Sequence, residues 1–222
     1  MALAFNTKVE DGKGYEQREA LEPGTYDAIL SAIIDLEHQI NDYDKDNPKV
    51  EHQIKLLFEI PEQTREVNGE VMPVILSKKL SMSWGERSNL RKVVSALRKK
   101  ETTPEEVKTM LRTDGGLNEL LGKALVLQVE SYKIKATDSA GNPIVMNKVT
   151  GYSSLRASLA QPQPVRTPFY FEVATPDLAI FKDKLSKWTR DEIMTANNNE
   201  EFPAELHKAY RDIKEEENAK TK

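Results

Sequence analysis

The chain has 222 residues, with 32 Lys and Arg, 36 Asp and Glu, three His and no Cys. The absence of cysteine excludes disulfide frameworks, thiolate nucleophiles and cysteine-containing zinc sites. No apolar run approaches the roughly 18 residues needed to span a bilayer, and the first residues lack the basic start and apolar centre of a signal peptide. We therefore expect a cytoplasmic protein without membrane contact, built from one sizeable domain and an extension.

The net charge of −4 conceals an uneven distribution of charged residues. Residues 10–62 include 14 acidic and 5 basic side chains, whereas residues 77–100 include 8 basic side chains and one acidic. A second basic stretch, 123–166, has 6 basic and 2 acidic side chains. Two such stretches in an acidic chain can form a local positive surface; the alternative is a solvated helix face with ordinary surface lysines.

The first half of the chain predicts three antiparallel strands. Residues 1–20 are polar and are typical of a flexible arm. From Tyr26 to Leu36, apolar side chains occupy every second position, which predicts a strand with one buried face. Residues 52–60 and 74–82 show the same period, with Pro61 marking an edge or a bulge. Between them, Asn68 and Gly69 are a strong hairpin signal, because both turn positions need a positive φ.

Helical period then replaces strand period. Residues 83–86 fit a capping box, and residues 90–97 follow with one apolar helical stripe. Residues 103–106 repeat the start signal with proline at the first helical position, and Gly115 and Gly116 end that helix. Strand period returns in residues 123–135, where Tyr132 has the opposite parity to the preceding apolar residues, and in residues 144–152.

The remainder of the chain predicts a connector and helices. The prolines of residues 161–168 are typical of a stiff, extended connector, and residues 169–171 form a short strand or an anchor. A helix is expected after Pro176, with Phe181 and Trp188 packed on one side. A capping box at residues 189–192 and a last helix from Pro203 follow, before an acidic C-terminal region.

Three strands, a helix and two strands is the element order of the OB-fold. We therefore expect an α+β structure that is mainly β: a five-stranded Greek-key barrel in residues 21–158, with the helix between the third and fourth strands closing one end. Residues 159–222 are expected to be a proline-containing connector and an acidic, helical C-terminal extension. The order alone does not assign a function.

Four stretches of the sequence also resemble bacteriophage single-stranded DNA-binding proteins of the OB type. They are Pro23-Gly-Thr-Tyr-Asp-Ala-Ile-Leu, Ile54-Lys-Leu-Leu-Phe-Glu-Ile-Pro, Ser88-Asn-Leu-Arg-Lys and Leu120-Leu-Gly-Lys-Ala-Leu-Val-Leu-Gln-Val. The resemblance implies a protein that coats transiently exposed single strands during phage DNA replication and recombination, in the host cytoplasm. Many such proteins recruit partner enzymes through an acidic tail with a terminal aromatic residue. Here the sequence ends in Ala-Lys-Thr-Lys, which departs from that pattern.

Binding of single-stranded DNA without sequence preference needs cations along the phosphates and aromatic faces on which bases stack. Each candidate has a structural alternative: Trp84 can cover the core, a half-buried tyrosine is ordinary, and Lys78 and Lys79 point to opposite faces of a strand. The candidates for DNA binding are Lys55, Lys78, Lys79, Trp84, Tyr132, Lys133, Lys135, Lys148, Tyr152 and Arg156.

No catalytic pattern accompanies these residues. The sequence lacks a glycine-rich phosphate loop and a nucleophile elbow, and the acidic residues 42–46 lack the glycine and glutamate of an EF-hand loop. We expect no metal, no cofactor and no enzymatic activity. The expected partners are single-stranded DNA, replication or recombination proteins that contact the C-terminal extension, and a second copy of the chain. The alternative is a phage protein-interaction module that binds and modulates a host protein, which the acidic first third favours.

Overall fold

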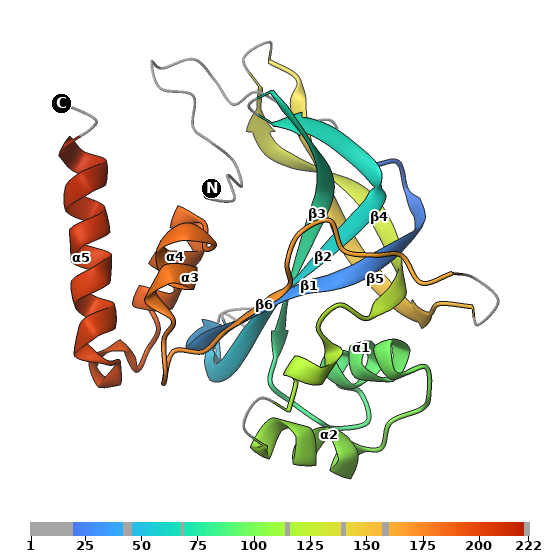
Figure 1. Ribbon diagram of the computed structural model, residues 1–222, viewed down its shortest axis with the longest axis horizontal. Helices are drawn as coiled ribbons and strands as arrows, with labels where there is room; N and C mark the ends of the chain where they lie inside the picture. Colours follow the sequence, from blue (N-terminus) through green and yellow to red (C-terminus); the bar gives the residue numbers. More distant parts are fainter. Residues whose placement is uncertain are drawn as a thin grey trace.

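A computed structural model describes residues 20–41, 46–67, 69–113, 116–138, 141–156 and 160–219. The predicted arm, apart from residue 20, and the last three residues lie outside these ranges. The described residues form an α+β structure (Figure 1). Its strands are β1 (Gly24–Asn41), β2 (Lys49–Val67), β3 (Glu70–Ser81), β4 (Ala124–Thr137), β5 (Pro143–Ser154) and β6 (Phe169–Phe171). Its α-helices are α1 (Asn89–Arg98), α2 (Pro104–Arg112), α3 (Leu178–Asp183), α4 (Lys187–Met194) and α5 (Ala204–Ala219), with 3-10 helices η1 (Asn118–Leu120) and η2 (Asn199–Glu201).

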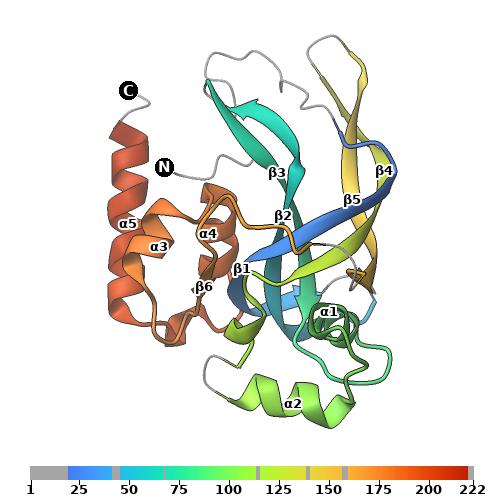
Figure 2. The same cartoon turned by 45° about the vertical axis from the view of Figure 1, so that its right-hand side comes forward.

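The strands form one mainly antiparallel sheet in the order β3-β2-β1-β4-β5, and β6 pairs with β1 in parallel. The two ends of this order also meet, because β3 contacts β5 and Lys78 Nζ donates a hydrogen bond to the carbonyl oxygen of Val149 at 3.2 Å. Figure 2 shows the β2–β3 and β4–β5 hairpins extending away from α1 and α2. Among the described ranges, none of the helices combines the length and apolarity that a membrane span requires.

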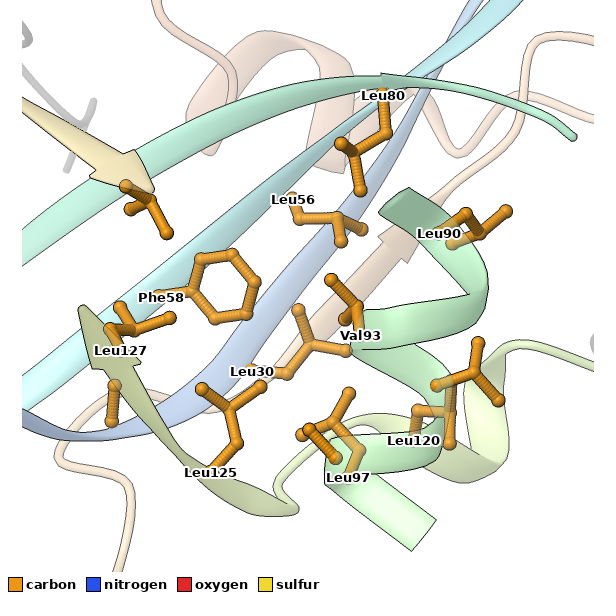
Figure 3. Packing of buried hydrophobic residues seen from close by; sticks show 14 of the residues in the cluster. Leu30, Leu56, Phe58, Leu80, Leu90, Val93, Leu97, Leu120, Leu125 and Leu127 are labelled. Carbon is orange, nitrogen blue, oxygen red and sulfur yellow. The ribbon is translucent and has the colours of Figure 1, made fainter. Parts of the chain in front are cut away.

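The inner core lies between the curved sheet and α1 (Figure 3). The apolar stripe predicted on α1 is fully buried and meets the alternating apolar residues of β2 and β4. Helix α1 begins later than its predicted capping box, however. Ser88 is the N-cap, and its Oγ accepts a hydrogen bond from the backbone N–H of Arg91 at 3.2 Å, whereas Ser83 lies in the preceding turn.

Strand β1 is buried on both faces, so the prediction of one buried face is wrong. Ala28, Leu30 and Ile33 point into the inner core, and Ala32 and Ile34 point the other way. A β-bulge between Leu30 and Ala32 shifts the alternation. The second face is buried because the C-terminal helices cover it, forming an outer core that includes Leu57, Phe171, Phe181, Ile193 and Leu206.

The C-terminal elements differ in detail from the predicted ones. Asp177 and Ser186 are the N-caps of α3 and α4, so the capping box predicted at Thr189 is wrong. Phe181 is fully buried, but the break between α3 and α4 leaves Trp188 with 57% of its surface exposed. The connector is held against β2, because the buried carboxylate of Glu59 accepts hydrogen bonds from the backbone N–H groups of Val165 (2.5 Å) and Arg166 (3.3 Å).

Candidate nucleic-acid interface

The β4–β5 hairpin continues beyond the inner core and exposes both apolar and cationic side chains. Val129 and Val149 are the last buried pair of these strands. Beyond them, Tyr132 pairs across the hairpin with Met146, and their side chains are 42% and 36% exposed. Directly opposed residues of antiparallel strands share a face, so this pair forms an exposed apolar patch.

Lysine side chains lie on both faces of the hairpin near this patch. Lys148 pairs across the strands with Glu130, and its Nζ lies 3.0 Å from a Glu130 carboxylate oxygen. By strand alternation this pair shares the face of Tyr132, whereas Lys133 lies on the opposite face. Lys135 lies within a register shift between Lys133 and Thr137, and both Lys133 and Lys135 are exposed. The hairpin therefore presents Tyr132 and Lys148 on one face and Lys133 on the opposite face.

The other face of the hairpin is anchored to the start of the described chain. The amide of Asn147 donates to the carbonyl oxygen of Leu21 at 2.8 Å and accepts from the Leu21 N–H at 2.8 Å. Ser131 Oγ donates to the same carbonyl at 3.0 Å. These contacts tie the base of the hairpin to the segment before β1, which stabilises its position relative to the core.

Lys55 and Lys79 lie elsewhere, on the outer face of β2 and β3. They are directly opposed across these strands, and both contact the carboxylate of Glu192 in α4. The Nζ–Oε distances are 2.6 Å for Lys55 and 2.7 Å for Lys79. Burial would raise the pKa of Glu192, but the two ammonium groups outweigh it and hold the pKa below its usual value of 4.5. The C-terminal layer thus neutralises both lysines.

Tyr152 and Lys78 belong to the interior and to the contact between β3 and β5. Tyr152 packs against Phe58 with ring centroids 6.1 Å apart, and its hydroxyl is buried without a hydrogen-bond partner. Burial raises the pKa of this hydroxyl well above its usual value. Lys78 Nζ is bonded to Val149 O, as described above. Neither side chain is placed to stack on a base or to follow a phosphate backbone.

Trp84 precedes α1, and Arg156 follows the end of β5 that pairs with the start of β4, so both lie away from the tip of the β4–β5 hairpin. Trp84 is 40% exposed in the turn before α1, and Arg156 is exposed after β5. The cations of α1 are partly engaged there: Arg91 contacts Glu101 at 3.8 Å, and Arg98 contacts Glu119 at 3.6 Å. This end is therefore less cationic than the sequence count of residues 77–100 suggests.

The ten predicted residues thus fall into separate regions rather than one surface. The largest group is Tyr132, Lys133, Lys135 and Lys148 on the β4–β5 hairpin, and Lys55 and Lys79 form a second group on β2 and β3. Sequence analysis missed Met146, whose pairing with Tyr132 depends on the hairpin register, and Glu192, which lies 137 residues after Lys55. The turn at residues 138–142 was the available signal for the pairing of Met146. The acidic composition of the C-terminal region was the available signal for Glu192. Comparisons with protein-family models, curated proteins and solved structures gave no match for this chain.

Proposed function

We propose that the sheet is an OB-type barrel and that the protein binds single-stranded DNA without sequence specificity. The strand order β3-β2-β1-β4-β5, the contact between β3 and β5, and the position of α1 between β3 and β4 support the barrel. The element order expected for an OB-fold is thus accompanied by the strand neighbours that such a barrel needs.

The observation that carries the DNA-binding proposal is the exposed patch of Tyr132 and Met146 among lysines on the β4–β5 hairpin. An exposed aromatic ring can stack on any base, because every base has a π-face, and each stacked base contributes about 1–3 kcal/mol. Lys133, Lys135 and Lys148 supply positive charge near this ring for the phosphates. Together they provide the two elements of sequence-tolerant binding, although Glu130 offsets part of the charge of Lys148.

The resemblance of the sequence to phage single-stranded DNA-binding proteins supports a role for this activity in DNA replication and recombination. In that role the protein coats exposed strands in the host cytoplasm, and replication or recombination proteins bind its C-terminal extension. The activity requires no catalytic group and no cofactor. Lys55, Lys79 and Tyr152 are left out of this site, because Glu192 engages the two lysines and the ring of Tyr152 packs against Phe58 of the inner core.

Fluorescence anisotropy with labelled oligo-dT tests the proposal. We expect the Lys133→Glu/Lys135→Glu variant to bind more weakly, with a slope of log affinity against log salt smaller by about 1.4, since two phosphate contacts to a single strand are lost. The matched control is Lys184→Glu/Lys208→Glu, which makes the same change of net charge on exposed C-terminal helices. Equal losses in both variants would indicate a non-specific effect of net charge, and unchanged binding in the first would exclude the hairpin.

Tyr132→Ala tests the stacking contribution separately. The loss of about 1–3 kcal/mol per stacked base corresponds to a five- to 150-fold weaker affinity. Because this substitution removes no charge, we expect the salt slope to stay unchanged. Double-stranded DNA should bind much more weakly than oligo-dT, since its bases are not available for stacking.

A second candidate function, binding of a partner protein, is favoured by the exposed apolar residues of the C-terminal layer. Trp188 is 57% exposed and Leu178 is 38% exposed. Tryptophan is enriched among the residues that dominate protein interfaces. If the chain is a module that modulates a host protein, oligo-dT binding should be absent at both low and high salt.

A further inference from the structure

We propose that Glu37, His38 and His52 form a binding site for one divalent transition-metal ion, with Zn²⁺ as the preferred ion. The sequence does not reveal this cluster, because His52 follows His38 by 14 positions and no metal-binding spacing joins them. The antiparallel register of β1 and β2 pairs His38 directly with His52, and their ring centroids lie 5.1 Å apart. Each of the three residues offers a ligand atom within 4.8 Å of the others.

The geometry of the cluster is close to what a tetrahedral ion requires. With metal–ligand distances of about 2.0–2.1 Å, two ligand atoms of a tetrahedral Zn²⁺ are separated by about 3.3 Å. Nδ1 of His38 and Oε2 of Glu37 are already 3.1 Å apart. All three ligand atoms lie within 4.8 Å of one another, so the remaining ligand atom has to approach by up to about 1.5 Å to reach the tetrahedral separation.

The backbone at this point holds Glu37 next to the histidines. A β-bulge between Asp35 and Glu37 interrupts the register with β2, and Glu37 has a φ of 57°, a left-handed conformation that costs free energy for a residue with a side chain. In a regular strand, Glu37 and His38 would point to opposite faces. The left-handed backbone at Glu37 departs from strand geometry, and here the carboxylate lies beside the imidazole, with Oε2 3.1 Å from Nδ1 of His38.

Neighbouring side chains orient the ligands. Asp35, which is 7% exposed, lies with Oδ1 2.7 Å from Nε2 of His52, so Nδ1 of His52 is the nitrogen left for a metal. This is the carboxylate–histidine–metal arrangement in which a second carboxylate fixes the imidazole tautomer. Asn198 acts in the same way on Glu37, because its Nδ2 donates to Oε2 at 3.2 Å.

The ligand set indicates which ions bind. Two imidazoles and one carboxylate suit Zn²⁺ and its first-row neighbours, whereas Ca²⁺ and Mg²⁺ prefer oxygen ligands alone. Three protein ligands leave one position of a tetrahedral ion open. Asp35 and His52 also line a pocket of about 140 Å³ bordered by α2, so a cavity that can hold water adjoins the cluster.

Titration of the untagged, chelator-treated full chain with Co²⁺ tests the site. We expect one Co²⁺ per chain, with the visible absorption of a low-coordinate nitrogen and oxygen site, and displacement of Co²⁺ by Zn²⁺. Binding of no Co²⁺ at micromolar concentrations, or of Mg²⁺ equally well, would overturn the proposal.

Variants distinguish this site from adventitious binding. His38→Gln and His52→Gln should each abolish the Co²⁺ spectrum, and Asp35→Asn should weaken binding about 10- to 100-fold, the usual effect of losing an orienting carboxylate. The remaining histidine provides the matched control, since His207 lies in α5 outside the cluster, and His207→Gln should bind Co²⁺ as the parent does. An unchanged Co²⁺ spectrum in His38→Gln would contradict the site. Because the His38 side chain is 45% exposed, we expect this variant to fold as the parent does.

Discussion

The lysines of β2–β3 and those of the β4–β5 hairpin have the same chemistry but different surroundings. Lys55 and Lys79 point outward from paired strands, yet the C-terminal layer covers that face and supplies Glu192 to both. Lys133 and Lys135 lie where β4 has left the core, and both are exposed among the residues that the structure describes. The comparison shows that what packs on a strand decides whether its cations are available to a ligand.

The strongest test of this comparison is whether the C-terminal layer is part of the same cooperative unit as the sheet and its inner core. Phe181 is fully buried in the outer core, with its ring 5.7 Å from that of Phe171. We expect Phe181→Ala to lower the free energy of unfolding by about 3–5 kcal/mol, because a large cavity replaces the ring. Urea denaturation followed by circular dichroism and by tryptophan fluorescence should show one coincident transition.

The matched control is Trp188→Ala, because Trp188 belongs to the same layer but is exposed. We expect it to change stability by less than about 0.5 kcal/mol. Two separate transitions in the parent protein would mean that the layer detaches from β1 and β2, and then Lys55 and Lys79 would become available in the partly unfolded state.

Glu192→Gln removes the negative charge that neutralises Lys55 and Lys79, a charge that the lysines of the β4–β5 hairpin do not contact. Lys55, whose side chain is 13% exposed, would keep its charge without a counterion, whereas Lys79 is more than half exposed and loses little. We expect the free energy of unfolding to fall by about 1–3 kcal/mol. Affinity for oligo-dT should stay within about two-fold, because the proposed site is the other hairpin. A large gain in affinity would instead assign DNA binding to the outer face of β2–β3.

The pH dependence of stability should follow the same interaction. The pKa of Glu192 is lower in the folded protein than its usual value of 4.5, so the unfolded chain takes up a proton first as pH falls. The stabilisation is fully present above pH 4.5 and is lost as pH falls through the folded-state pKa. The difference in unfolding free energy between the parent and Glu192→Gln should therefore be constant near neutral pH and shrink below pH 4.5. A difference that persists in acid would exclude the ion pairs as its source.

Much of the architecture follows from local sequence patterns. Alternating apolar residues in β2 and β4, the stripe on α1 and the capping box of Thr103 and Glu106 each predict the element that is observed. Local patterns do not show what covers a strand from a distance. The second buried face of β1 depends on residues more than 130 positions away, such as Phe171, and on a bulge at Ser31 that reverses the alternation.

The candidate site was less predictable for the same reason. Residues on one hairpin could be grouped by sequence, and Tyr132, Lys133, Lys135 and Lys148 do lie together. The engagement of Lys55 by Glu192 and the closeness of His38 to His52 depend on tertiary packing and on strand register, respectively. Composition indicates which side chains can act, whereas packing decides which of them remain exposed.

The smallest expected effect is a change in stability that distinguishes Tyr152 of β5 from Tyr132 of β4. The hydroxyl of Tyr152 is buried without a partner, and such a group costs free energy because it has lost its hydrogen bonds to water. Tyr152→Phe removes the hydroxyl and keeps the ring against Phe58, so we expect unfolding free energy to rise by about 1 kcal/mol and DNA affinity to stay unchanged. Urea denaturation and anisotropy measure the two quantities on the same sample. Because Tyr132 is exposed on the same hairpin, a loss of DNA affinity in Tyr152→Phe equal to that in Tyr132→Ala would show that the Tyr152 hydroxyl contributes as much as the Tyr132 ring, and the site would then not be confined to the exposed end of the hairpin.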